Sequence, residues 1–172
     1  MMRLFTITIF VVLVGGLMTK PVAAQEVTPL DATATAKIKS EVSDAVASYL
    51  KVFNAHDPKG VAENAQAAPS FVVLPSFGIL PYLHTEDVAK FSGDAMTQMK
   101  GAGWDRSKLD IASVCVLAAD MALASGNTTR YRTDGTVMNV IGETLLYVRT
   151  KEGWRIGGLI LHQPNKVVTC NG

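Results

Sequence analysis

The sequence predicts an α+β domain in which three N-terminal helices cover one face of a mainly antiparallel sheet. Two observations carry this prediction. Apolar residues recur at helical spacing in the first half of the chain, and four strand-like runs follow Trp104. The length of 172 residues, with 48% hydrophobic residues and 7 prolines, suits one globular domain.

The first 24 residues have the pattern of a secretory signal peptide. Arg3 precedes an apolar run from Leu4 to Met18, and Val22 and Ala24 are placed for cleavage before Gln25. An uncleaved membrane anchor is the alternative, but the run has only about the minimum length for a span. We therefore expect an exported protein, periplasmic or extracellular, that is not attached to a membrane after cleavage.

Two helices are expected after a flexible lead at residues 25–33. In the first helix, which ends near His56, the apolar residues share one face: Ile38, Val42, Ala45, Tyr49 and Phe53. Asp57 followed by Pro58 is a start signal for a second, short helix that reaches Ala65. Asp accepts hydrogen bonds from free amides, and Pro at the first helical position loses none.

A short hairpin and a third helix come next. Phe71–Leu74 and Ile79–Tyr82 are strand-like, and the surrounding prolines favour a small hairpin or two edge strands over a central strand. Thr85 is expected to cap the third helix, which Gly101 ends.

The rest of the domain has the pattern of an antiparallel meander. An Asp-Gly turn signal at Asp134 joins its middle strands. The four expected strands are Leu109–Leu117, Met121–Arg132, Val137–Thr150 and Trp154–His162. The domain is expected to span residues 34–164, followed by a C-terminal tail at residues 165–172.

The two cysteines could form a disulfide in an oxidising compartment. Cys115 lies in an apolar run, where a small buried hydrophobic residue is the simpler interpretation, and Cys170 is among the last three residues, where order is poor. We therefore favour unpaired cysteines, with an intramolecular disulfide as the alternative.

The order of these elements and several motifs resemble the nuclear transport factor 2-like superfamily, also called cystatin-like or SnoaL-like. The motifs are YLKVFNAHD in the first helix, then ALASG, RYRTDG and the closing pair ETLLYVRTKEGWRI. The similarity covers nearly all of the expected domain and is greatest to small members of uncharacterised function. It implies a strongly bent sheet wrapped around the helices as a cone, with a pocket at the open end.

The superfamily includes ketosteroid isomerase, scytalone dehydratase, limonene epoxide hydrolase and polyketide cyclases, together with non-catalytic and dimerising modules. Its fold therefore does not determine function. Because members often dimerise through the convex face of the sheet, the resemblance also implies a homodimer through the sheet.

Several classes of function have no support in the sequence. The net charge of +1 and the lack of basic runs argue against nucleic-acid binding. No nucleophile elbow, phosphate-binding glycine loop or dinucleotide motif is present. His56, His84 and His162 lie far apart, so no metal site is predicted, and no cofactor is expected.

Acid–base groups on the inner wall of a cone are the remaining route to chemistry. The catalytic candidates are Glu143, His162 and His84. Glu143 shares a strand face with Leu145 and Tyr147, where burial would raise its pKa; a solvated, outward-facing glutamate is the alternative. His84 precedes the third helix near the expected mouth, where a histidine that meets only solvent is the alternative.

The candidate ligand-binding residues are Tyr49, Phe53, Tyr131, Tyr147 and His162. Plain core packing is the alternative for Tyr49 and Phe53, although the hydroxyl group of Tyr49 needs a partner when buried. Arg130 and Tyr131 point to opposite faces of one strand, so one of them faces inward if the strand is covered there.

The last strand is apolar on both faces, so both faces are expected to be covered. Strict alternation groups His162 with Trp154, Ile156 and Ile160. On the concave face, the histidine would lie beside the pocket. On the convex face, it would belong to a subunit contact.

The leading expectation for function is an exported domain that binds a small, mainly apolar ligand. One alternative is an acid–base enzyme, an isomerase, dehydratase or hydrolase, with Tyr131 as an oxyanion donor. The other is a non-catalytic dimerisation or interaction module whose pocket is filled.

Overall fold

The structure is a computed structural model that describes residues 29–170, so the expected signal peptide lies outside the described residues. It confirms the α+β class with three helices and a mostly antiparallel sheet. In chain order the elements are α1 (Ala32–Asn54), α2 (Pro58–Gly60), the π-helical turn η1 (Val61–Ala65), β1 (Gln66–Leu74), β2 (Gly78–Tyr82), α3 (Thr85–Gly101), β3 (Trp104–Ala118), β4 (Met121–Arg132), β5 (Val137–Thr150) and β6 (Gly153–His162).

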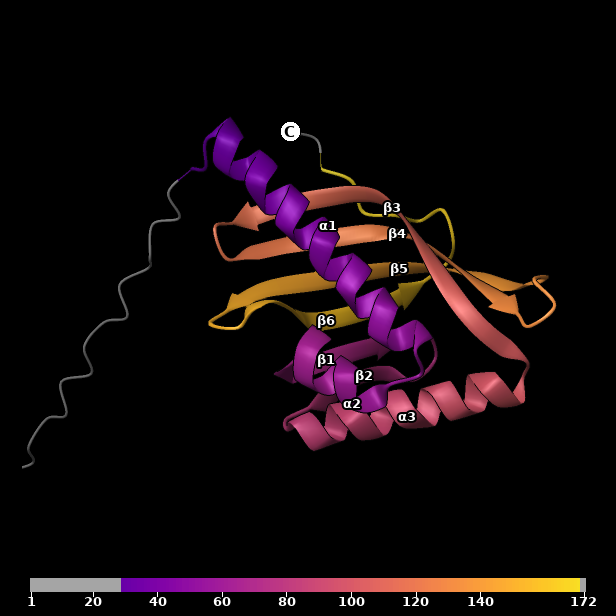
Figure 1. The fold of residues 1–172 in the computed structure, drawn as a ribbon. Helices are drawn as coiled ribbons and strands as arrows, with labels where there is room; N and C mark the ends of the chain where they lie inside the picture. Colours follow the sequence, from indigo (N-terminus) through magenta and orange to yellow (C-terminus); the bar gives the residue numbers. More distant parts are fainter. Residues whose placement is uncertain (1–28, 171–172) are drawn as a thin grey trace, which may run out of the picture.

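The strands form one sheet in the order β2-β1-β6-β5-β4-β3, in which only β1 and β6 run parallel. Figure 1 shows α1 crossing one face of this sheet, with α3 below it and joined to the long, bent β3. We call the face toward α1 the inner face and the opposite one the outer face. The core lies between the helices and the inner face, and its most fully buried large side chains include Val42, Val46, Leu145, Tyr147 and Ile156.

Helices α2 and α3 begin where a side chain can accept a hydrogen bond from a free backbone amide. Asp57 Oδ1 accepts the Gly60 amide hydrogen at 2.8 Å, as the sequence predicts. The cap position of α3 is His84, and the Asp87 side chain accepts the His84 amide hydrogen at 3.0 Å. The prediction that Thr85 caps this helix is therefore wrong by one residue.

β1 is not an edge strand, contrary to the prediction from its prolines. It lies between β2, which is the edge, and β6. Pro69 follows a cis peptide bond and occupies the part of β1 where the register with β6 shifts, between Gln66 and Phe71. Proline has no amide hydrogen to donate. Because the β1–β6 hydrogen-bond ladder is interrupted at this position, none is needed there.

A bulge in β6 makes the alternation expected for the last strand wrong. The register between β5 and β6 shifts beside Gly157, which is left as an extra residue. Ile156 and Leu159 therefore both lie in the core, although strict alternation puts them on opposite faces. His162 consequently lies on the outer face and not with Ile156.

The C-terminal segment crosses the outer face of the sheet. Cys170 forms a disulfide with Cys115 of β3, so the expectation that the cysteines remain unpaired is wrong. The Val168 amide also donates to Ser125 Oγ of β4 at 2.9 Å. The C-terminal segment thus covers part of the outer face of its own sheet. The sequence analysis expected a partner subunit to cover this face.

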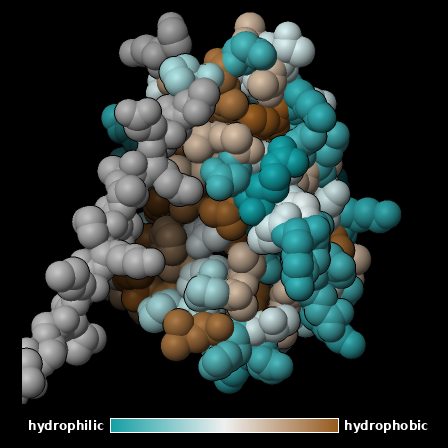
Figure 2. Space-filling view, turned by 90° about the vertical axis from the view of Figure 1, so that its left-hand side faces the viewer, coloured by the Kyte–Doolittle hydropathy of each residue, from teal (hydrophilic) through white to brown (hydrophobic). Residues whose placement is uncertain are grey.

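The two sides of the molecule differ in polarity. Figure 2 views the side of the β3–β4 and β5–β6 turns, where hydrophilic side chains dominate the half formed by α1 and apolar atoms gather toward the outer face of the sheet. Leu117 and Met121 are exposed at the β3–β4 turn. Within residues 29–170, no helix is long and apolar enough to cross a membrane.

Candidate functional site

A cavity of about 310 Å³ lies between α1, α3 and the inner face of the sheet. This volume is at the lower end of the range of about 300–1,000 Å³ that is typical of small-molecule sites. Half of its lining residues are apolar: Leu50, Phe53, Val61, Leu74, Phe91, Ala95, Met99, Leu159 and Leu161. The others are polar: Tyr49, Gln66, Ser92, Asp94, Gln98, Ser107, Thr128, Arg130 and Glu143.

Glu143 of β5 lies at the buried end of this cavity, with only 4% of its surface exposed. Thr128 of β4 donates its hydroxyl hydrogen to Glu143 Oε2 at 2.5 Å. Burial raises the pKa of Glu143, although the Thr128 hydrogen bond and the charge of Arg130 act in the opposite direction. A carboxyl group whose pKa is raised by burial is a candidate proton donor or acceptor.

Arg130 of β4 is the cationic side chain in the cavity wall. Its guanidinium group forms none of the ion pairs in the described part of the chain. Its Nε is buried, and no described residue accepts a hydrogen bond from it. Burial lowers the pKa of Arg130, while the neighbouring Glu143 favours its charged form.

Two tyrosines lie close to Glu143. Tyr49 of α1 lines the cavity, whereas Tyr147 of β5 lies in the core outside the lining. Burial raises the pKa of both phenols above the usual value, so each remains protonated and able to donate a hydrogen bond. The Tyr147 hydroxyl is buried without a hydrogen-bond partner among the described residues.

Three of the candidate residues from the sequence line the cavity, and they are Tyr49, Phe53 and Glu143. The alternative in which Glu143 is outward and solvated is excluded by its burial. The candidates that do not line it are Tyr131, Tyr147, His84 and His162.

Each of the candidates outside the cavity has a structural explanation. Tyr131 follows a register shift, and its ring lies under Arg106 with 4.8 Å between the guanidinium carbon and the ring centre. Arg130 is the member of this neighbouring pair that faces inward. His84 is exposed at the start of α3.

His162 belongs to a chain of hydrogen bonds on the outer face. Its Nε2 lies 2.9 Å from Thr144 Oγ1, and its Nδ1 lies 2.9 Å from the Gln163 carbonyl oxygen. Thr144 Oγ1 is in turn 2.7 Å from Ser125 Oγ, which accepts from the C-terminal segment. With Nδ1 protonated, every hydroxyl group in this series of hydrogen bonds has both a donor and an acceptor. His162 therefore helps to anchor the C-terminal segment, and it lies on the opposite face of the sheet from the cavity.

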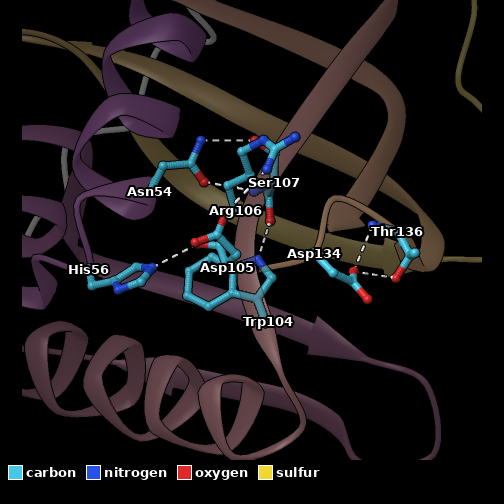
Figure 3. A network of polar contacts seen from close by, with 8 residues as sticks. All are labelled: Asn54, His56, Trp104, Asp105, Arg106, Ser107, Asp134 and Thr136. Atoms are coloured by element: carbon cyan, nitrogen blue, oxygen red, sulfur yellow. Dashed lines mark hydrogen bonds and ion pairs between the residues drawn. The ribbon is translucent and has the colours of Figure 1, made fainter. Parts of the chain in front are cut away.

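One end of the cavity is fixed by a seam between α1 and β3, drawn in Figure 3. The Asn54 side chain donates to the Ser107 carbonyl and accepts from the Ser107 amide, each at 2.8 Å. His56 Nε2 lies 2.8 Å from the Asp105 carbonyl oxygen, and Trp104 Nε1 donates to Ser107 Oγ at 3.0 Å. This seam holds Ser107 in the cavity wall beside the end of α1.

The sequence reasoning missed Thr128 as a site residue and left Arg130 undecided. Alternation along β4 puts both on the face of Ala122 and Ala124, which are core residues. Their position near Glu143, whose direct partner on β4 is Gly126, depends on the β4–β5 register, which the Asp-Gly turn signal alone does not fix. Within residues 29–170, no group of three His, Cys, Asp or Glu side chains has a metal-binding arrangement.

Solved structures share this fold at low sequence identity. An NTF2-like protein with a cystatin-like fold from Novosphingobium aromaticivorans matches with a TM-score of 0.62 and 19% identity, over 79% of this chain and 92% of the other. An NTF2-like superfamily protein from Salmonella enterica serovar Typhimurium matches with a TM-score of 0.57 and 21% identity, over 80% and 99%. A ketosteroid isomerase-like protein from Erwinia carotovora atroseptica matches with a TM-score of 0.54 and 17% identity, over 72% and 93%.

No curated protein matches the chain significantly. A family model described as NTF2-like protein (DUF6841) matches residues 40–164, which include every strand of the sheet and most of the helical part. The sequence resemblance to the nuclear transport factor 2-like superfamily is thereby confirmed, and the chain belongs to the NTF2-like protein family DUF6841.

Proposed function

We propose that this protein is an exported domain that binds a small, mainly apolar ligand in the cavity between α1, α3 and the sheet. The observation that carries the proposal is a cavity with a large apolar wall and one buried, incompletely bonded carboxyl group, Glu143, in its lining. Burying a carboxyl group without full compensation costs stability, and such costs persist mainly where a site uses the group.

A cavity-filling substitution tests this proposal. Ala95 of α3 lines the cavity, so Ala95→Leu should remove ligand binding by occupying the space. Ala47 is exposed on α1, and Ala47→Leu serves as the matched control. Hexanol is the probe, followed in proton–nitrogen correlation spectra, and mass spectrometry identifies any molecule that co-purifies. Unchanged hexanol binding in Ala95→Leu would exclude this cavity as the site.

An acid–base enzyme is the second candidate function, and the environment of Glu143 favours it. Burial raises the pKa of this carboxyl group toward the pH range in which a general base or acid is effective. The similarity to a ketosteroid isomerase-like protein also suggests an isomerase, dehydratase or hydrolase. Incubation of a co-purified molecule with wild-type protein and with Glu143→Gln separates the candidates, since only an enzyme would convert it and only the wild type would do so.

The location and assembly are also part of the proposal. The Cys115–Cys170 disulfide supports export, because disulfides persist in oxidising compartments. The exposed Leu117 and Met121 support a homodimer that covers the rest of the outer face. Sedimentation of wild-type protein and of Leu117→Glu tests this assembly. A dimer that binds neither hexanol nor a co-purified molecule would instead favour the interaction module.

A further inference from the structure

We propose that the ligand of this cavity is a small monocarboxylate whose head group binds between Arg130 and Glu143, an inference that rests on the ligand-binding function proposed above. The apolar part of the ligand would lie against the apolar wall, and the carboxylate would accept hydrogen bonds from both side chains.

Arg130 is unpaired among the described residues. A guanidinium group presents five donors in a planar fork that matches a carboxylate, and it is costly to bury without an acceptor. Arg130 Nε is buried with no partner among the described residues, and none of their carboxyl groups forms an ion pair with the side chain. A ligand acceptor would supply what the protein does not.

Glu143 is hydrogen-bonded through only one of its oxygens. Thr128 is bonded to Oε2, and no other described side chain bonds the carboxyl group. Because burial favours the protonated form, the other oxygen can carry a hydrogen and donate it to a ligand carboxylate. A protonated Glu143 also removes the repulsion that an anion would otherwise meet at this end of the cavity.

The charged side chains around the cavity favour a ligand that carries one negative charge. The titratable groups that act on Glu143 are Arg130 of β4, Tyr49 of α1 and Tyr147 of β5 and, from the outer face of β6, His162. Asp94 of α3 also lines the cavity. Among the described residues, Arg130 is the only arginine or lysine in the lining, so a doubly charged phosphate would remain partly unneutralised.

Hexanoate and hexanol test the proposal on the full chain with its disulfide intact, because they share an alkyl chain and differ in the head group. We expect hexanoate to bind roughly 10- to 100-fold more tightly, since its hydrogen bonds are charge-assisted. Arg130→Met keeps the apolar stem of the side chain and removes its charge. It should abolish this preference, because it weakens hexanoate binding far more than hexanol binding.

The pH dependence of hexanoate binding is a second readout. The bound anion favours the protonated form of Glu143, so the complex takes up a proton from solvent. Hexanoate affinity should therefore increase as the pH falls, until hexanoate itself becomes protonated. Glu143→Gln keeps a donor for the carboxylate and should bind hexanoate with much weaker pH dependence.

The outcomes separate this proposal from the function on which it rests. Equal affinity for the two probes, unaffected by Arg130→Met, overturns the carboxylate proposal and leaves ligand binding standing. If neither probe shifts the signals of the lining residues, both proposals fall. Hexanol binding reports whether the cavity is intact in Arg130→Met. If that variant loses the cavity, the hexanoate and hexanol affinities are compared in Arg130→Gln.

Discussion

The hydroxyl group of Thr128 on β4 donates to Glu143 Oε2 on β5 at 2.5 Å, at the buried end of the cavity. The two residues are fifteen positions apart in the sequence and meet only through the β4–β5 pairing. This contact is the one direct hydrogen bond to the Glu143 carboxyl group from a described residue, so it orients that group and opposes the effect of burial on its pKa.

Thr128→Val should raise the pKa of Glu143 further, because the hydrogen bond that favours the charged form is removed. The change nearly conserves volume and should cost about 1–3 kcal/mol in the free energy of unfolding at neutral pH. Carboxyl-carbon NMR titration and urea denaturation measure the two effects. Thr129→Val, at the neighbouring half-buried position, is the control.

The stability of Glu143→Gln should depend on pH in one direction. The pKa of Glu143 is raised in the folded state, so the folded protein binds more protons than the unfolded chain between the two pKa values, and wild-type stability falls as the pH rises through this interval. Glutamine does not titrate. The variant should therefore gain stability relative to wild type from acidic to neutral pH, and a constant difference in denaturant midpoints would contradict this.

The bulge in β6 should make adjacent glycines respond differently to alanine. A Cβ at Gly158 would lie 2.3 Å from the Phe71 ring, whereas a Cβ at Gly157 would lie 3.3 Å from the nearest methyl group of Val148. We expect Gly158→Ala to lose about 1–3 kcal/mol through overpacking, and Gly157→Ala to lose less. Thermal unfolding of both variants measures this, and equal losses would mean that Phe71 moves aside.

Loss of the disulfide should destabilise the whole domain. Cys115 and Cys170 are separated by 55 residues, so the bond restricts most of the sheet in the unfolded chain. Cys170→Ser should cost about 2–4 kcal/mol in the free energy of unfolding. Wild-type protein in reductant is the matched comparison and should show the same loss. The Asn127–Asn165 contacts, at 3.1 and 2.9 Å, should keep the start of the tail on β4 in both cases.

Removal of the seam between α1 and β3 should loosen the cavity wall. Asn54→Ala leaves the Ser107 amide and carbonyl without their side-chain partner, which should cost about 1–3 kcal/mol. Asn64→Ala is the control, because Asn64 is exposed on the short η1 turn. Hydrogen exchange at Ser107 should become faster in Asn54→Ala alone, and unchanged protection would mean that the seam is dispensable.

Much of the fold could be predicted because it depends on local signals. The bounds of β4 and β5 agree with the apolar runs and the Asp-Gly turn between them, and α3 begins one residue before the predicted start and ends at Gly101 as expected. The errors arose where long-range pairing overrides a local rule. Pro69 is accommodated in an internal strand by a shift in register with β6, a strand that lies far away in the sequence.

The candidate site could be predicted only in part. Glu143 was identifiable because its strand neighbours are apolar, which indicates an inward face. Arg130 was left undecided because alternation within β4 cannot say which of two opposite faces is covered. His162 was assigned to the wrong group of residues because one extra residue, Gly157, reverses the alternation of everything after it.

By itself, the sequence determined the α+β class, the order of the elements and the superfamily, because periodicity, capping residues and turn signals act within a few residues of one another. Only the tertiary structure decided which side chains meet. Strand register, the β6 bulge and the Cys115–Cys170 bond join segments that are distant in the chain. These contacts depend on packing and loop closure over the whole domain, and they bring Glu143, Thr128 and Arg130 into one cavity while leaving His162 on the other face of the sheet.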